Sequence, residues 1–306
     1  MARGYRNLAD LDCEAPARGA AILGANAQGK TNLLESIYYP VLFRSFRGAP
    51  DQQIVGGAGG FHVELDLDSA GAQHISTTYQ GRKKRITLDG EVIGRVTEAV
   101  GAWVAVAFLP SDLGLASGPA TERRLYLDRL LSLASRSYLR ALGRFRAALA
   151  QRNSALRQGH TDLARAFDAP LAESGAEMVR IRIEWVAGAA EQFAGEFDCL
   201  GEREPARLLY QGSAELGDAS SWSWALDVSL PEDLARGMTT IGPHRHDLLL
   251  EIGGRRIRDY GSTGQQRSAA VALKLIEIST LRQSRGSEPA LLLDDVFAEL
   301  DRDRQT

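Results

Sequence analysis

The stretch GANAQGKT, from Gly24 to Thr31, limits the possible folds of this chain more than any other feature. It fits the pattern G-x-x-x-x-G-K-[ST], in which a glycine-rich turn directs its backbone N–H groups at a phosphate. The pattern requires a strand before the turn and a helix after it. The apolar residues 20–23 predict a short buried strand, and residues 31–39 predict a helix that ends before Pro40. A chance glycine turn is the alternative.

Every residue of this turn is a candidate nucleotide contact. In such a site the lysine reaches the β- and γ-phosphate oxygens, and the hydroxyl that follows it is a ligand of Mg²⁺. We therefore assign a catalytic and binding role to Lys30 and a metal-binding role to Thr31. The expected ATP contacts are Gly24, Ala25, Asn26, Ala27, Gln28, Gly29, Lys30 and Thr31.

A P-loop needs an acid at the end of a neighbouring strand, and ALLLDDVFAELD, residues 290–301, supplies one. Leu291–Leu293 reads as a buried strand, and Asp294 ends it, placed to hold Mg²⁺. Asp295 comes next, where a carboxylate could polarise the attacking water. Alone, the segment could equally be an ordinary strand followed by an acidic turn.

A second candidate anion site lies in DYGSTGQQRSAAVALKLIEI, residues 259–278. The small polar residues before a strong helix combine bare backbone N–H groups, a hydroxyl and the positive end of the helix dipole. We expect Ser262, Gly264 and Gln265 to contact a phosphate. The alternative is a capped helix start, because Ser and Thr are ordinary N-caps.

Composition predicts a soluble, reduced cytoplasmic protein of about two domains. The 306 residues are 44% hydrophobic and 25% charged, no apolar run approaches the roughly 18 residues of a membrane span, and the polar start does not resemble a signal peptide. Cys13 and Cys199 lie far apart, without metal-ligand spacing.

Hydrophobic patterning predicts an α/β fold with two lobes. We expect strands at residues 61–67, 75–79, 85–93, 103–110, 207–211, 222–228, 248–257 and 289–293, with Asp89-Gly90 as a hairpin turn. Helices are expected at residues 121–159, 171–197 and 264–283. We assign residues 1–110 with 288–306 to a nucleotide-binding lobe, and residues 111–287 to a largely helical lobe. The helices are too short for long coiled-coil arms.

Candidate DNA contacts are basic. Residues 123–157 contain nine arginines, no lysine and one acid, and Arg136, Arg140 and Arg144 repeat along one helix face. Such a row neutralises phosphates without reading bases. Lys83 and Lys84 form a second candidate. A solvated arginine face is the alternative for the row. Trp222 and Trp224 are expected in the core, and His244 and His246 are expected to be structural or interface residues.

The motif order resembles an ABC-type ATPase head, and the match extends to one family. The segments NAQGKTNLLESIYY, RSFRG, FLPSDLGLASGPATERRLYLD, IGPHRHDL, GSTGQQRSAAVALKLIEI and LLLDDVFAELD together resemble the RecF family of bacterial recombination mediators. These proteins are similar to the heads of the SMC and double-strand-break repair ATPases, without their long coils. A transporter nucleotide-binding subunit would carry LSGGQ and a Q-loop glutamine, and a P-loop kinase or GTPase would lack the signature loop. An ATP-gated scaffold whose binding, not turnover, matters stays open, as does another SMC-like or transport-coupled head.

The resemblance implies an ATP-dependent homodimeric clamp that binds DNA and helps to load recombinase on gapped DNA. In this class the signature loop caps the γ-phosphate held by the partner's P-loop, so Ser262, Gly264 and Gln265 would contact the second subunit's ATP. The resemblance also implies binding to single-strand/double-strand junctions, RecR as a partner, and roles in replication, repair and the SOS response.

The sequence departs from the family pattern at several places. The family's opening strand is mostly missing, and the segment after Asp301 that senses the γ-phosphate is absent. His246 stands where an acid is usual, Ser111 where an acid often precedes Asp112, and no glutamine marks the Q-loop. We therefore expect ATP and Mg²⁺ binding, and leave weak ATP hydrolysis open.

Overall fold

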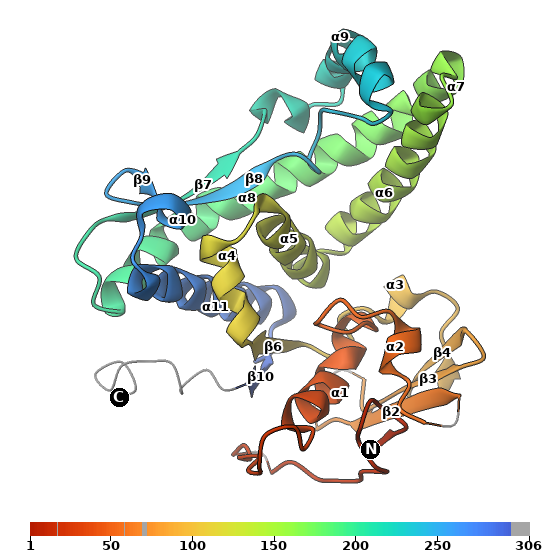
Figure 1. The fold of residues 1–306 in the computed structure, drawn as a ribbon, viewed down its shortest axis with the longest axis vertical. Helices are drawn as coiled ribbons and strands as arrows, with labels where there is room; N and C mark the ends of the chain where they lie inside the picture. Colours follow the sequence, from red (N-terminus) through yellow and green to blue (C-terminus); the bar gives the residue numbers. More distant parts are fainter. Residues whose placement is uncertain (17, 58, 69–71, 295–306) are drawn as a thin grey trace. The chain divides into compact units, whose positions relative to one another are not determined.

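The computed structural model describes residues 1–16, 18–57, 59–68 and 72–294 (Figure 1). The chain divides into two compact units. The first comprises Met1–Pro110 with the segment that begins at Pro289, and the second is Ser111–Glu288. In the part of the chain that is described, no helix combines the length and the apolar character that crossing a membrane would require.

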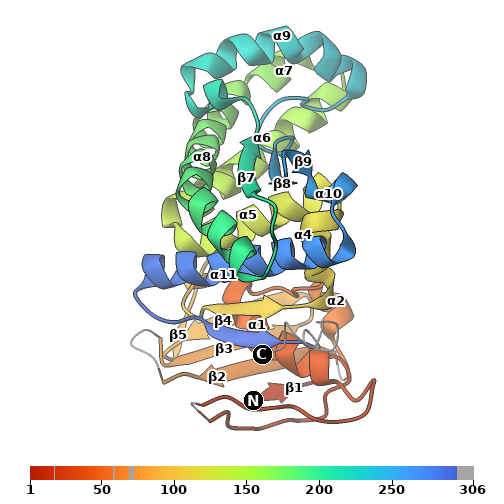
Figure 2. The same ribbon diagram turned by 90° about the vertical axis from the view of Figure 1, so that its left-hand side faces the viewer.

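The first unit contains a five-stranded antiparallel sheet whose strands follow one another in chain order (Figure 2). It consists of β1 (Ala2–Arg3), β2 (Gly60–Asp66), β3 (His74–Gln80), β4 (Lys83–Leu88) and β5 (Glu91–Val92). Asp89 and Gly90 join the last two strands, both with positive φ, at 49° and 87°. Positive φ at both central residues is the geometry of a type I′ hairpin turn, so the hairpin predicted at this dipeptide is confirmed.

A second, parallel sheet in this unit positions the acid of the candidate site. Strand β6 (Ala105–Phe108) pairs with β10 (Ala290–Leu293), and the two strands end together at Phe108 and Leu293. Helix α1 (Lys30–Leu42) packs against both sheets, and the short helices α2 (Asp51–Ile54) and α3 (Val96–Ala99) complete the unit.

Aromatic rings form the centre of this core. Tyr5, Tyr39 and Phe61 meet edge-on with ring centroids 5.2 to 5.9 Å apart, and Phe61 stacks on Tyr79 at 5.5 Å. All four side chains are buried. Edge-on and offset pairs of this kind add stabilisation beyond the burial of apolar area, so β2, β3, α1 and the N-terminal segment are held together as one body.

The second unit is mostly helical (Figure 1). After a 3₁₀ turn, Pro110–Leu113, its helices are α4 (Gly114–Ser117), α5 (Ala120–Ala134), α6 (Arg136–Arg157), α7 (Thr161–Arg165), α8 (Asp168–Cys199), α9 (Ser220–Arg236), α10 (Ile257–Tyr260) and α11 (Thr263–Arg285), with a second 3₁₀ turn at Ala214–Gly217. The long helices α6 and α8 pack side by side. The helices predicted for residues 171–197 and 264–283 are confirmed, whereas the helical range 121–159 consists of two helices, α5 and α6, separated by the extended Ser135.

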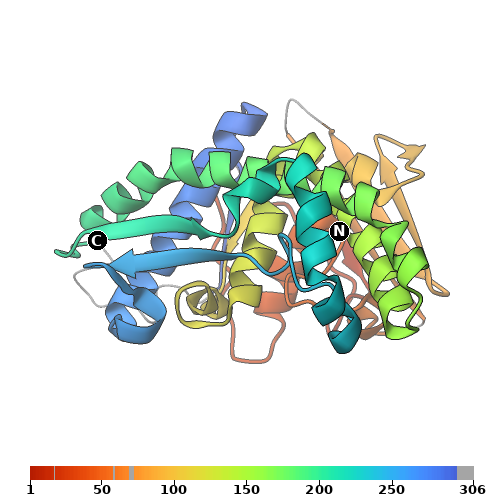
Figure 3. The ribbon, with the colours of Figure 1, turned by 90° about the horizontal axis from the view of Figure 1, so that it is seen from above.

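A small antiparallel sheet lies along α8. Strands β7 (Ala206–Gln211) and β8 (Asp247–Ile252) run side by side, and β9 (Arg255–Arg256) pairs with the end of β8 (Figure 3). β7 packs against α8, whereas α10 follows β9 directly and leads into α11. The end of this sheet is therefore connected through α10 to the start of α11.

Arg152 and Arg182 are among the buried arginines of the second unit. Arg182 donates to Asp128 and Tyr138, at 2.7 and 2.8 Å, and Arg152 donates to Asp168 and Asp233, at 2.7 and 2.6 Å. A buried charge is tolerated only when it is paired and hydrogen-bonded. These networks join α5, α6, α8 and α9 at fixed positions.

Three local predictions are wrong. The apolar residues 20–23 form no strand, and Leu23 is 90% exposed. A short apolar run becomes a strand only where a neighbouring strand accepts its hydrogen bonds, and no described strand pairs with this one. Helix α1 also continues through Pro40 to Leu42 instead of ending before the proline.

The third error concerns residues 222–228, which belong to helix α9 and not to a strand. Trp222, Leu226 and Leu230 are buried at helical spacing, whereas Trp224 is 70% exposed. The two tryptophans are two residues apart, which is the spacing typical of a strand. The segment is nevertheless a helix, because one helical face of α9 packs against α6 and α8. The prediction of a core position therefore holds for Trp222 and fails for Trp224.

Candidate nucleotide-binding site

The P-loop turn requires glycine immediately before helix α1. Gly29 has a φ of +99°, a left-handed conformation that side chains rarely adopt. A Cβ atom at this position would lie 2.9 Å from Asn7 Oδ1 and 3.1 Å from a methyl group of Leu8. The N-terminal segment therefore packs directly against the turn, and only glycine lets the backbone pass beneath it.

Asn7 is a site residue that the sequence reasoning missed. Its side-chain amide donates to the Ala27 carbonyl at 3.3 Å, and its Oδ1 accepts from Asn32 Nδ2 at 2.6 Å. Asn7 thus connects the middle of the turn to the first turn of α1. The weak sequence signal for this role is the polar Arg-Asn pair in a segment that otherwise lacks a motif.

Lys30 is directed back over its own turn. Its Nζ donates to the carbonyls of Gly24 and Ala25, at 2.8 and 3.1 Å. The ammonium group is therefore held against its own turn by two neutral acceptors. Because a phosphate oxygen is a stronger, charged acceptor, the lysine is placed where it can exchange a carbonyl for a phosphate.

Thr31 and Asp294 come together from opposite ends of the sequence. The Thr31 hydroxyl donates to Asp294 Oδ1 at 3.0 Å, and the Asp294 backbone N–H donates to the Phe108 carbonyl at 3.0 Å, which extends the pairing of β10 with β6. Asp294 is only 9% exposed. A hydroxyl beside a carboxylate is the pair of hard oxygen donors that Mg²⁺ prefers, so the residues present fit this ion.

An ion pair behind the turn fixes helix α1. Glu35 is fully buried and accepts from Arg6, whose Nη2 lies 3.0 Å from Glu35 Oε1, and also from the Ser45 hydroxyl. The hydrogen bond to Glu35 raises the pKa of Arg6 above its ordinary value. Arg6 and Asn7 are consecutive, so one short segment orients both the helix and the turn.

Asp295, the predicted partner of the attacking water, lies outside the described residues. Its assignment therefore stays a prediction from the sequence.

The signature segment, Ser262–Gln265, begins helix α11 in the second unit. The Ser262 hydroxyl accepts from the Gln265 backbone N–H at 3.2 Å, and the Ser262 N–H donates to Gln265 Oε1 at 2.9 Å. This reciprocal pair is a capping box. The capped helix start considered in the sequence analysis is thus present, while Ser262 remains exposed.

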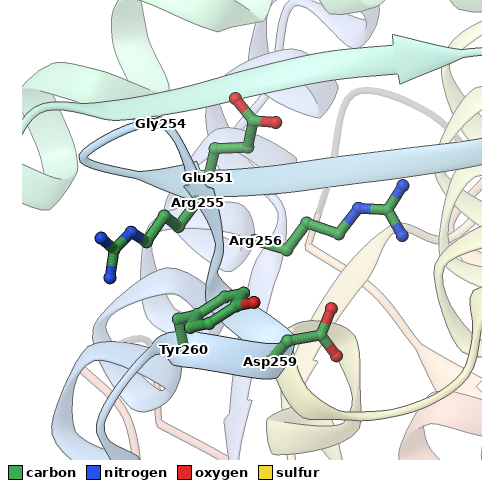
Figure 4. A pocket seen from close by; sticks show the side chains of 6 residues that line it. All are labelled: Glu251, Gly254, Arg255, Arg256, Asp259 and Tyr260. Carbon is green, nitrogen blue, oxygen red and sulfur yellow. The ribbon is translucent and has the colours of Figure 1, made fainter.

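Residues 251–260, which come just before this segment in the sequence, line an open pocket (Figure 4). Arg255 lies over the Tyr260 ring, with its guanidinium carbon 5.6 Å from the centroid, and Arg256 extends in the opposite direction, away from the ring. Tyr260 is 69% exposed. The sequence reasoning missed this pair of exposed arginines beside an aromatic ring, although the run RRIRDY is a recognisable signal.

The arginine-rich stretch divides into two kinds of side chain. Arg123, Arg129, Arg146 and Arg152 form ion pairs with acids elsewhere in the second unit. The predicted DNA-contacting residues of α6, Arg136, Arg140 and Arg144, are exposed. Counting charge along the sequence therefore overstates the exposed basic surface, because distant acids neutralise part of it.

Lys83 and Lys84 have different environments. Lys83 is exposed on β4, whereas Lys84 forms an ion pair with Asp51 at 2.8 Å, donates to the Phe43 carbonyl and lies over the Tyr39 ring. Lys84 therefore stabilises the first unit, and this corrects the expectation that both lysines are available to a phosphate. Lys83 stays a candidate.

The remaining lysine, Lys274, is buried on α11 with its ammonium 2.6 Å from Glu277, which also accepts from Arg129 at 3.2 Å. Burial lowers the pKa of Lys274. Burial alone would raise the pKa of Glu277, but Arg129 and Lys274 lower it overall. This buried charge cluster ties α11, which carries the signature segment, to α5.

His244 and His246 are neutral structural residues. His244 Nε2–H donates to the Thr239 carbonyl at 3.0 Å, and His246 Nδ1 contacts the Tyr210 hydroxyl at 2.7 Å. Burial lowers the pKa of each imidazole to about 4. His246 also closes the space above Gly212, where a Cβ atom would lie 2.5 Å from the ring.

The fold and this site define a P-loop protein with the architecture of an ABC-type ATPase head that lacks a long coiled coil. The chain matches none of the protein-family profiles with which it was compared. It is 35% identical over 311 residues to the DNA replication and repair protein RecF of Anaeromyxobacter dehalogenans (strain 2CP-C), covering 97% of this chain and 84% of that protein. It is 33% identical over 316 residues to the protein of that name from Geobacter sulfurreducens, covering 98% and 85%. The chain therefore belongs to the RecF family.

Solved structures agree with this assignment. The chain superposes on structures of the recombination mediator protein RecF in the RecFOR pathway, described as RecF-ATPrS and RecF-ATP, each with a TM-score of 0.89. Sequence identity to these structures is 32% and 31%, and the superposition covers 99% of this chain and 86% of each solved chain.

Proposed function

We propose that this chain is an ATP-dependent DNA-binding protein of recombinational repair and replication, a recombination mediator whose nucleotide gates a homodimer. The observation that carries the proposal is the contact between Thr31 and Asp294, which joins a P-loop to the acid at the end of β10. The names of the similar proteins, and the ATP in the names of the similar structures, support the nucleotide and the process.

ATP is the proposed ligand of the turn from Gly24 to Thr31. Lys30 would bind the β- and γ-phosphate oxygens, and the backbone N–H groups of the turn would bind the β-phosphate. Thr31 and Asp294 would hold Mg²⁺, which neutralises phosphate charge when it is bound. Asp295 is proposed as the residue that polarises water, in an enzyme that hydrolyses ATP weakly.

The proposed dimer has two-fold symmetry. The exposed Ser262, with Gly264 and Gln265, would contact the γ-phosphate held by Lys30 of the second copy, so that two nucleotides lie between two chains. The position of the segment supports this role, because the exposed Ser262 lies at the N-terminus of α11, where the positive end of the helix dipole favours an anion.

DNA is the proposed partner of the exposed face of α6. Arg136 is exposed at the start of α6. An exposed row of arginines along one helix is complementary to the charge of a phosphodiester backbone. Arg140 and Arg144 continue the basic row, and Lys83 is a separate candidate contact.

Three further parts of the proposal rest on family membership alone. They are gapped DNA with single-strand/double-strand junctions as the substrate, RecR as a partner, and assistance to recombinase loading. The cytoplasmic location likewise stays a prediction.

The molar mass of the chain, measured by light scattering with and without ATP and with and without gapped DNA, tests the proposal. We expect ATP with Mg²⁺ to double the mass, and gapped DNA to favour the doubled form. A chain that binds no ATP in equilibrium dialysis would contradict the nucleotide assignment. A chain that binds ATP but stays monomeric on DNA would contradict the gating alone.

A further inference from the structure

A cluster of histidines and carboxylates lies on one face of the adjacent strands β2 and β3, within the first unit. Along β2, His62, Glu64 and Asp66 alternate with the buried Phe61 and Val63, so their side chains leave the same face.

On β3, His74 is the register partner of Asp66 and Thr78 is the partner of His62. The antiparallel pairing therefore brings four metal-ligating side chains, His62, Glu64, Asp66 and His74, to one small area. None of them belongs to the P-loop site.

The ligand atoms are close enough to share an ion. Glu64, Asp66 and His74 each offer one atom, and these atoms lie within 4.8 Å of one another. In the described residues no other group of three such side chains is this close. His74 Nδ1 lies 2.8 Å from Asp66 Oδ1, and His74 Nε2 lies 3.8 Å from Glu64 Oε1. Ligands about 2.0 to 2.2 Å from one tetrahedral zinc ion are roughly 3.3 Å apart, so small side-chain movements suffice.

A second histidine holds the Glu64 carboxylate from its other side. His62 Nε2 lies 3.0 Å from Glu64 Oε2, and His62 Nδ1 lies 2.8 Å from the Thr78 hydroxyl. Both ring nitrogens of His62 are thus engaged, which fixes the ring and, through it, the carboxylate. Outer partners of this kind orient metal ligands and strengthen binding.

The chemistry of the set limits the ion. One imidazole and two carboxylates form a mixed nitrogen and oxygen set, which suits a first-row divalent ion better than Ca²⁺ or Mg²⁺. The two carboxylates supply negative charge. The nitrogen of His74 that binds the ion must be the unprotonated one.

We propose that Glu64, Asp66 and His74 form a binding site for a divalent transition-metal ion of the Zn²⁺ type, with His62 and Thr78 as positioning residues and water in the remaining positions. The ion joins two adjacent strands of the sheet. It therefore stabilises the hairpin, independently of any nucleotide.

Titration of the nucleotide-free chain with Zn²⁺ in a calorimeter tests this proposal, carried out with Cys13 and Cys199 replaced by alanine so that exposed thiols do not contribute. We expect one ion per chain. H74A and E64Q should each abolish this binding, and H62A and T78V should weaken it about 10- to 100-fold. Matched controls are H160A, an exposed histidine on another element, and D294N, which alters the P-loop acid; both should bind like the parent.

Two further measurements separate loss of the site from loss of the fold. Metal-free H74A and E64Q should show the circular dichroism spectrum of the parent. Zn²⁺ should raise the melting temperature of the parent and of D294N, but not that of H74A. Absence of saturable binding, or equal binding by the parent and H74A, would overturn the site. Loss of binding in D294N alone would assign the ion to the P-loop and would also overturn it.

Discussion

The Thr31 hydroxyl donates a hydrogen bond to the Asp294 carboxylate at 3.0 Å, across 263 positions of sequence. This contact brings a residue of the first turn of α1 to the end of β10. Asp294 is in turn fixed by its backbone hydrogen bond to Phe108.

The first prediction tests this pair. T31V keeps the shape of the side chain but removes the hydroxyl, so ATP affinity measured with Mg²⁺ should fall toward the value measured with a chelator. D294N should have the same effect. T31S, which keeps the hydroxyl, is the matched control and should bind like the parent. If T31V retains the full Mg²⁺ dependence, Thr31 is not a metal ligand.

The second prediction concerns Lys30. A hydrogen bond to a charged group contributes about 1.5–3 kcal/mol, so K30M should lower ATP affinity roughly 10- to 150-fold. K30R should also lower ATP affinity, because a planar guanidinium does not reproduce the shape of a compact ammonium group. K83M, a change of an exposed lysine on β4, should leave affinity unchanged. Wild-type affinity of K30M in equilibrium dialysis would remove the P-loop assignment.

Much of this site was accessible from the sequence, because its chemistry depends on local spacing. The glycine turn, Lys30, Thr31 and Asp294 follow motif patterns that hold wherever a turn meets a phosphate. Asn7 and Arg6 were not predicted, since their roles depend on how a distant segment packs against the turn.

The errors in the fold have the same origin. Residues 222–228 resemble a strand until the faces buried against α6 and α8 are known, and Lys84 resembles a free cation until Asp51 is placed beside it. The spacing of apolar residues and the charge of a segment are local properties of the sequence. Burial and ion pairing, in contrast, are set by residues far away in the sequence.

The third prediction concerns the exposed row on α6. Replacing Arg136, Arg140 and Arg144 by alanine should weaken DNA binding evenly across sequences. Each lost phosphate contact should reduce the slope of log affinity against log salt by about 0.9. R180A is the matched control, an exposed arginine of α8 that pairs with Glu184 on its own helix. An unchanged slope in the triple variant would indicate a solvated face.

The fourth prediction is a pH dependence of stability. Burial lowers the pKa of His244 from its ordinary 6.5 to about 4 in the folded chain. Between these values the unfolded chain binds more protons, so the free energy of unfolding should rise with pH from about 4 to 6.5 and fall on acidification. The difference corresponds to at most about 3 kcal/mol.

Urea unfolding at several pH values measures this effect. H244Q should reduce the rise and leave the part that His246 contributes, whereas H160Q, at an exposed position, should keep the full rise. Equal slopes in H244Q and the parent would show that His244 is not the group responsible.

The last prediction separates the two roles of Ser262. As an N-cap it contributes about 1 kcal/mol to the stability of α11, and as a signature residue it would contact the second subunit's ATP. S262N keeps a good N-cap, whereas S262R loses the cap and adds bulk. Both variants should bind ATP as monomers with the affinity of the parent, because Lys30 and the P-loop turn are intact.

S262R should lose ATP-induced dimerisation, measured as molar mass by light scattering. S262N isolates the signature role, because its stability should match that of the parent while its dimerisation is impaired. A mixture of S262R with K30M should recover part of the dimerisation, since one chain supplies an intact P-loop and the other an intact signature segment. If S262R instead abolishes ATP binding in the monomer, the segment acts on the nucleotide of its own chain, and the two-fold arrangement is wrong.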